Sequence, residues 1–175
     1  LGKAMAENRD DFILALYLGR YAGFRIHECF RMDTAAAEQA LRENALTVKG
    51  KGGKVRIVPI EDERILMMLK RVLAQTERGH KLLVPDGMPT DRSINALELF
   101  IYRHRNEISD EGSDRRLTFH GLRHTYAAEK YTRLTEGGMS AIDAHYAVSR
   151  LLGHERADVT NIYLASVRKR GRDGE

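Results

Sequence analysis

The chain has 175 residues, of which 42% are hydrophobic and 31% are charged, and its formal net charge is +4. This size and composition predict one domain with a real core and exclude a disordered chain. The longest apolar run, Phe12 to Leu18, is too short to cross a bilayer, and the first residues lack the apolar segment of a signal peptide. Cys29 is the only cysteine, which excludes internal disulfides and Cys-rich zinc sites and fits a reducing cytoplasm.

Basic residues gather in three places along the chain. The first is the stretch from Lys49 to Arg56, which holds four cations and no acid. The second includes Arg115, Arg116 and Arg123, and the third lies in the tail after residue 167. Any one cluster is typical of a solvated surface. Three of them beside polar motifs favour contact with the phosphates of an anionic partner.

The first half of the chain predicts helices followed by a β-hairpin. Helices are predicted over residues 10–21, from Arg25 through Arg31 and over 34–40, and strands over 46–48 and 55–59. Arg25 and Glu28 fall on one helical face, where a surface ion pair is the simplest interpretation. Asp33 is placed to cap the third helix. The glycine-rich, basic segment between the strands predicts a flexible hairpin tip.

The second half predicts helices only. They begin at the acids 61–63, at Asp91 or Ser93, at His120 and after Ser140, and a last short one carries Tyr163. Apolar residues at helical spacing give the first two a core face. Thr118 is a plausible N-cap, and glycines at 79, 137, 138 and 153 mark helix ends. The expected fold class is therefore α+β and mainly α-helical, with a small antiparallel hairpin at one edge.

Two histidines and an arginine lie close together in the sequence Thr118 to Tyr126. His120 and Arg123 are three positions apart on a predicted helix, so both can face one anion. His120 and His124 also have the i, i+4 spacing that can hold zinc. The glutamate of the His-Glu-x-x-His motif is missing, and His154 is the only evident third ligand. A metal site is therefore the weaker interpretation.

Tyr163 lies shortly after the sequence Gly153-His154. A tyrosine in such a place is most often a core residue whose hydroxyl bonds a neighbour. It can also be a covalent nucleophile, and with an ordinary pKa near 10 it would then need cations nearby. Arginine and histidine side chains would supply them.

Four separated motifs together resemble the catalytic domain of the tyrosine recombinase (phage integrase) family. The resemblance covers the chain from about Asp10 to Leu164, and the motifs occur in the family's order. The motifs are Gly23-Phe24-Arg25-Ile26-His27-Glu28, the hairpin Val48 to Pro59, Thr118 to Ala127 with its His-x-x-Arg, and Leu151-Leu152-Gly153-His154 followed by Tyr163. The resemblance implies a tyrosine-recombinase catalytic fold for the chain, 1–175, without the family's separate N-terminal core-binding domain.

The resemblance also implies a role for each motif residue in breaking and rejoining DNA. Arg25 and Arg123 would clamp the scissile phosphate and stabilise its transition state. Tyr163 would attack phosphorus and form a 3′-phosphotyrosyl link. His120 would assist its proton transfer, and His154 would bond the phosphate.

The general acid that protonates the departing 5′ oxygen would come from the hairpin. The Gly-Lys-Gly position favours Lys51, while Lys49 and Lys54 remain competing candidates. The 3′-phosphotyrosyl ester retains the energy of the phosphodiester bond that was broken. The resemblance therefore implies that neither a metal nor ATP nor another cofactor is needed. Other cations would contact the DNA backbone, and these are Lys49, Lys54, Arg56, Arg115 and Arg116.

The expected function is site-specific recombination of double-stranded DNA, for the integration or excision of a mobile element. The resemblance implies a protein that is a monomer alone and a tetramer on paired DNA sites. It would work in the cytoplasm, at the nucleoid, and be encoded by a bacterium, phage or mobile element. Three alternatives stay open: a type IB topoisomerase, which would relax supercoils as a monomer; a DNA-binding module without catalysis, which would form no covalent adduct; and a zinc hydrolase, which would contain stoichiometric metal.

Overall fold

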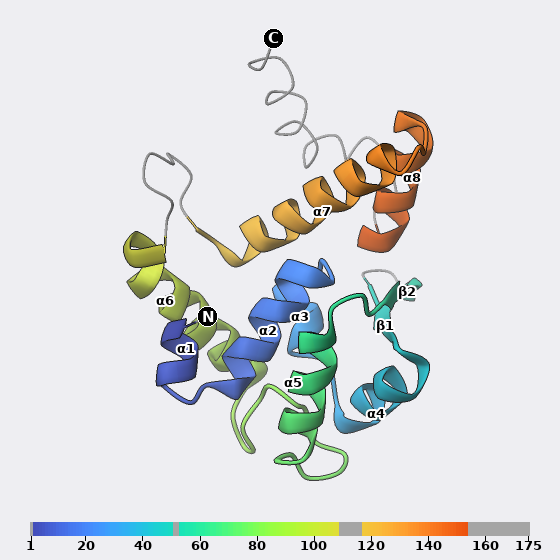
Figure 1. Cartoon of the computed structure of the whole chain (residues 1–175). Coiled ribbons are helices and arrows are strands. Elements are labelled where there is room, and N and C mark those ends of the chain that lie inside the picture. The colour runs from blue at the N-terminus through green and yellow to red at the C-terminus, as the bar shows by residue number, and fades with distance from the viewer. Residues whose placement is uncertain (1, 51–52, 109–116, 154–175) are drawn as a thin grey trace.

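The computed structural model describes residues 2–50, 53–108 and 117–153 (Figure 1). These residues form helices and one two-stranded antiparallel sheet. The elements are α1 (Gly2–Ala6), α2 (Asp10–Tyr21), α3 (Ile26–Cys29), α4 (Thr34–Glu43), β1 (Ala45–Lys49), β2 (Val55–Pro59), α5 (Glu63–Leu73), α6 (Thr90–Ile108), α7 (Phe119–Glu136) and α8 (Ala141–Leu152). The mainly helical α+β fold expected from the sequence is confirmed.

Helix α2 is the centre of the fold. Seven of its residues are buried, from Phe12 to Gly19, so it is apolar on nearly all sides. Helices α5 and α7 pack against it, and Figure 1 shows α7 crossing over its end. The approach is close at Gly19, where a Cβ atom would lie 2.9 Å from Cζ of Phe119. A larger residue at Gly19 would push α7 away from α2.

The β-hairpin lies at one edge of the molecule, next to α4 and α8 (Figure 1). Leu46 of β1 pairs with Val58 of β2, and Val48 pairs with Arg56. Leu46, Val48 and Val58 are buried, while the apolar Val55 and Ile57 face outward. Alternation therefore places Arg56 on the core-facing side of the sheet.

Helices α7 and α8 form a second, smaller core. Tyr126, Ala127, Val148 and Leu152 are its buried residues. The Thr118 hydroxyl accepts a 3.0 Å hydrogen bond from the Gly121 amide at the start of α7, as the capping pattern predicted. The α7–α8 pair then returns the chain so that the end of α8 lies near β2.

The long connection from α5 to α6 is fastened to the start of α4. The Thr34 amide donates to the carbonyl of His80 at 3.1 Å, and the Gly79 amide donates to the Thr34 hydroxyl at 2.8 Å. The Leu82 amide then donates to the carbonyl of Met32 at 2.9 Å. These bonds explain how a segment without its own helix or strand holds one conformation.

Several sequence predictions need correction in detail. Helix α6 begins at Thr90, before Asp91 and Ser93, and Ser93 is buried. Of the two adjacent methionines of α5, Met68 is buried in the core and Met67 is 59% exposed. Helix α1 has no counterpart among the predicted elements, and the predicted helix around Tyr163 lies outside the described residues. Within those residues, no helix is long and apolar enough to cross a membrane.

Candidate active site

The turn between α2 and α3 presents Arg25. Gly23 has φ of +65°, a conformation that favours glycine, and the chain leaves α2 there. Arg25 then takes the N-cap position of α3 in an extended conformation. Its amide donates to Oε2 of Glu28 at 2.7 Å, and its Nη1 donates to Oε1 at 3.2 Å. The Arg25 side chain stays 37% exposed, so its guanidinium is accessible to a ligand.

Arg123 of α7 is fully buried and joins three parts of the chain. Its Nη1 donates to the carbonyl of Gly23, and its Nη2 donates to the carbonyl of Leu152 at 2.6 Å. Gly23 begins the turn that carries Arg25, and Leu152 ends α8. A planar guanidinium suits this task because its donors point in fixed directions. Arg123 therefore fixes the Arg25 turn and the end of α8 relative to α7.

His120 lies one helical turn before Arg123 and is largely exposed. Partial burial of its ring, followed by the positive charges of Arg123 and Arg25, lowers its pKa below the ordinary value of 6.5. Both guanidiniums are therefore close enough for their charges to act on this ring. His120 is therefore neutral at pH 7 and can accept a proton.

Glu28 is the acid among these cations. Its side chain is 5% exposed, and Arg56 of β2 donates to both its oxygens, at 2.9 and 2.7 Å. Burial raises the pKa of Glu28, but the hydrogen bonds and charge of Arg56 and the Arg25 amide outweigh it, so the pKa lies below its ordinary value. Glu28 is therefore a carboxylate at neutral pH. Its ion pair with Arg25 is not the surface pair predicted from the sequence, because the carboxylate is buried and Arg25 precedes α3 as its N-cap.

The residues predicted to contact DNA differ in how exposed they are. Lys49 and Lys54 are exposed on the hairpin, as a phosphate contact requires. The Arg56 side chain is only 8% exposed and is already paired with Glu28, so its geometry argues against the predicted direct contact. The other predicted site residues lie outside the described part of the chain, and these are Lys51, Arg115, Arg116, His154 and Tyr163.

Tyr126 of α7 lies beside the turn that carries Arg25. Its ring packs against Gly23, where a Cβ atom would come within 2.4 Å of Tyr126 Cδ1. Burial, together with the charge of Glu61, raises the pKa of Tyr126 to about 12. Its hydroxyl is therefore a poor nucleophile at neutral pH, and the residue serves packing.

The rings of His120 and His124 meet edge to face, with centroids 4.7 Å apart. Within residues 2–50, 53–108 and 117–153, no third residue completes a metal-binding group with them. The third ligand weighed from the sequence, His154, lies outside these ranges. The described geometry thus gives the zinc interpretation no added support.

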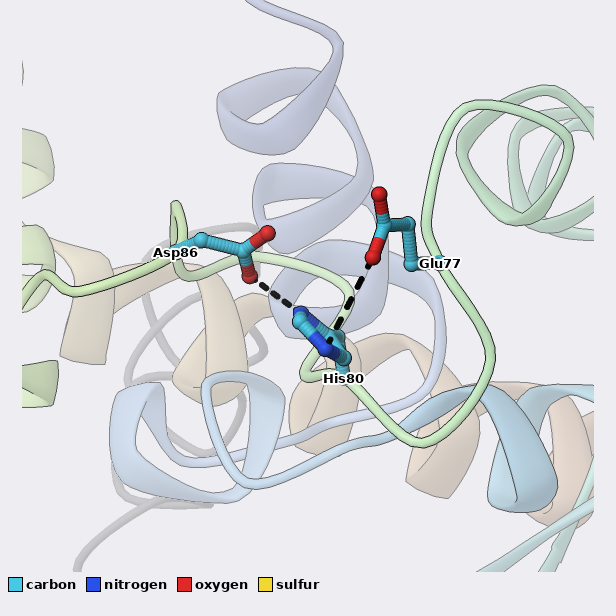
Figure 2. Close-up of side chains that lie close together, drawn as sticks. All are labelled: Glu77, His80 and Asp86. Carbon is cyan, nitrogen blue, oxygen red and sulfur yellow. Dashed lines mark hydrogen bonds and ion pairs between the residues drawn. The ribbon is translucent and has the colours of Figure 1, made fainter.

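A separate cluster of Glu77, His80 and Asp86 lies on the connection between α5 and α6 (Figure 2). Asp86 bonds Nδ1 of His80, while Glu77 lies 4.0 Å from Nε2. The hydrogen bond and charge of Asp86 raise the pKa of His80. Because the two carboxylates approach different ring nitrogens, we interpret the cluster as an ion-paired bridge within the loop. Figure 1 shows this loop at the far end of the molecule from α7 and α8.

The domain is mainly helical, and its turn and helix α7 bring together Arg25, His120 and Arg123. This arrangement agrees with the class of protein expected from the motifs. The sequence profile of the phage integrase family matches residues 4–170, and the chain belongs to that family. The chain is 27% identical over 170 residues to tyrosine recombinase XerD of Pseudomonas putida, covering 93% of the chain and 51% of the relative. It is 31% identical over 170 residues to XerC of Thermodesulfovibrio yellowstonii, covering 89% and 49%.

Solved structures share the fold. The crystal structure of XerA recombinase matches with a TM-score of 0.65 at 21% identity, covering 97% of this chain and 60% of the other. The Tn1549 transposon integrase, in complex with circular intermediate DNA, matches with a TM-score of 0.61 at 18% identity, covering 91% and 58%. The chain thus spans about half the length of the curated relatives it matches.

The buried role of Arg56 was not predicted from the sequence. Arg56 is a neighbour in sequence of the exposed hairpin cations, and it was therefore predicted to share their contact with DNA. The signal was present in the strand pattern, since Arg56 and the buried Val58 are two positions apart. The carbonyls of Gly23 and Leu152 as acceptors for Arg123 had no such signal, because a backbone contact leaves no mark on residue type.

Proposed function

We propose that this chain is the catalytic part of a site-specific DNA recombinase that breaks and rejoins strands through Tyr163. The observation that carries the proposal is the convergence of Arg25, His120 and Arg123. Arg25 and Arg123 are far apart in sequence, yet Arg123 holds the turn from which Arg25 projects. The accessible guanidinium of Arg25 beside the neutral imidazole of His120 forms a site for a phosphodiester, and the buried Arg123 holds that site in place.

The proposed reaction begins with attack by the Tyr163 hydroxyl on phosphorus. Neutral His120 accepts or relays the phenolic proton, and Arg25 donates to the phosphate oxygens on which negative charge develops. Arg123, which is buried, adds the effect of its positive charge from within the domain. Lys51 protonates the departing 5′ oxygen, and His154 bonds the phosphate. The product is a 3′-phosphotyrosyl ester and a free 5′ hydroxyl. Attack on this ester by the 5′ hydroxyl of another strand restores the DNA and releases Tyr163.

The partner in this proposal is double-stranded DNA, and the biological role is integration or excision of a mobile element. Support comes from the exposed Lys49 and Lys54 on the hairpin and from the integrases among the structures that share the fold. One of these is bound to circular intermediate DNA. Strand exchange requires two DNA sites, so we further propose that four copies assemble on paired sites.

The test is capture of the covalent intermediate. The chain is incubated with a pool of nicked duplexes of random sequence, in which the strand released by cleavage diffuses away. We expect a protein–DNA adduct that resists denaturation, forms in the presence of EDTA, and disappears with Tyr163→Phe. Tyr126→Phe is the matched control, because Tyr126 is buried with a pKa of about 12, and it should keep the adduct. An adduct that survives Tyr163→Phe would refute the nucleophile, and absence of any adduct would refute the reaction.

A further inference from the structure

Arg56 points into the protein although it belongs to a hairpin with exposed cations. It pairs across the sheet with Val48, and Val48 and Val58 on the same face are both buried. The residues on either side of it, Val55 and Ile57, are apolar and exposed. The strand therefore buries a charged residue and exposes two apolar ones, an arrangement that burial of apolar surface alone would reverse.

The interior partner of Arg56 is Glu28. Nη1 donates to Oε1 at 2.9 Å and Nη2 donates to Oε2 at 2.7 Å, so the pair is bidentate. The same carboxylate accepts the Arg25 amide at 2.7 Å and Arg25 Nη1 at 3.2 Å. One buried carboxylate thus links strand β2 to the turn that presents Arg25.

Arg56 also supports the end of α8. Gly153 ends that helix with φ of +64°, and a Cβ atom there would lie 3.1 Å from Cδ of Arg56. The guanidinium of Arg56 lies 5.7 Å from the centroid of the Phe24 ring. Strand β2, the turn before α3 and the end of α8 therefore meet around one side chain.

We propose that Arg56 is a positioning residue for Arg25, acting through Glu28. This inference rests on the proposed function, in which Arg25 binds the scissile phosphate. By occupying both oxygens of Glu28, Arg56 fixes the carboxylate that holds the Arg25 amide. It also neutralises that carboxylate, so the Arg25 guanidinium keeps donors for the phosphate instead of forming a full ion pair with Glu28.

The test uses Arg56→Lys, which keeps the charge but lacks the fork of donors that spans two oxygens. Arg42→Lys, the same change at an exposed position on α4, is the matched control. The first readout is hydrogen exchange of the Arg25 amide in the free protein. Loss of a charge-assisted hydrogen bond should speed this exchange about ten- to hundredfold in Arg56→Lys and leave it unchanged in Arg42→Lys.

The second readout is the rate of adduct formation on the nicked duplex pool at saturating DNA. We expect Arg56→Lys to slow it about tenfold or more, with DNA affinity within about twofold of wild type because the charge is kept. Unchanged exchange of the Arg25 amide would overturn the proposal, and so would faster exchange with an unchanged rate. If weaker DNA binding by itself accounted for the slower reaction, Arg56 would be a direct DNA contact, and the proposal would also be overturned.

If Arg56→Lys does not fold, Glu28→Gln tests the same link from the acceptor side with the same two readouts. If the wild-type chain forms no adduct, the proposed function fails, while hydrogen exchange still decides whether Arg56 holds the Arg25 turn. The two failures are therefore distinguishable.

Discussion

Replacing Gly23 by alanine should be among the most damaging single-methyl changes in this chain. Gly23 has φ of +65°, which an L-residue adopts only with strain. A Cβ atom there would lie 2.4 Å from Tyr126 Cδ1 and 3.1 Å from Leu152 Cδ2. Both neighbours are buried in the small α7–α8 core and have little room to move. The Gly23 carbonyl also accepts from Arg123, so any shift of the turn disturbs the proposed phosphate site.

The expected cost has two parts. The left-handed conformation costs about 1–2 kcal/mol for a residue with a Cβ atom. Forcing a methyl group against the Tyr126 ring adds about 1–3 kcal/mol of overpacking. Together they remove about 2–5 kcal/mol from a stability that for a domain of this size is about 5–15 kcal/mol.

Gly79→Ala is the control that separates the two parts. Gly79 has φ of +88°, but nothing lies within 4 Å of a Cβ atom there. The free energy of unfolding of Gly79→Ala should therefore fall only by the cost of the left-handed conformation, about 1–2 kcal/mol. Urea unfolding of both variants, followed by circular dichroism, measures the difference. Equal losses in the two variants would refute the steric argument and the close approach of α7 to the Gly23 turn.

Three other predictions concern charged groups. In Arg123→Lys, the lysine cannot reach both backbone carbonyls, so the free energy of unfolding measured in urea should fall by about 1–3 kcal/mol. An unchanged urea midpoint would contradict this. The lowered pKa of Glu28 stabilises the fold above the ordinary value of 4.5, and this stability is lost as pH falls through the folded pKa. Melting temperatures should thus drop in acid for the wild type and less steeply for Glu28→Gln; parallel curves would exclude Glu28 as a cause. The raised pKa of His80 should fall toward 6.5 in Asp86→Asn, as followed by NMR titration. The stability from that pair is complete below pH 6.5 and lost as pH rises through the folded pKa, and an unshifted His80 would rule the pair out.

The order and type of the elements after α1 could be predicted from the sequence. Helix α2 and the hairpin appear where apolar periodicity placed them, because period and turn residues are local properties. The caps at Asp33, Thr118 and Ser140 were equally local, since each side chain bonds a backbone amide three residues away. The family motifs likewise predicted Arg25, His120 and Arg123 as one group.

The tertiary structure decided how these groups are held. Arg56 and Lys49 look alike in the sequence, but the packing of the hairpin against α3 and α8 buries one and exposes the other. The partners of Arg123 are backbone carbonyls of Gly23 and Leu152, which any sequence would offer at those positions. Such contacts depend on which distant segments pack together, and the spacing of residues in the sequence does not reveal this. The sequence by itself therefore determined the chemical groups and the family, and only the fold determined which cations are exposed on the surface and which are buried and hold the site together.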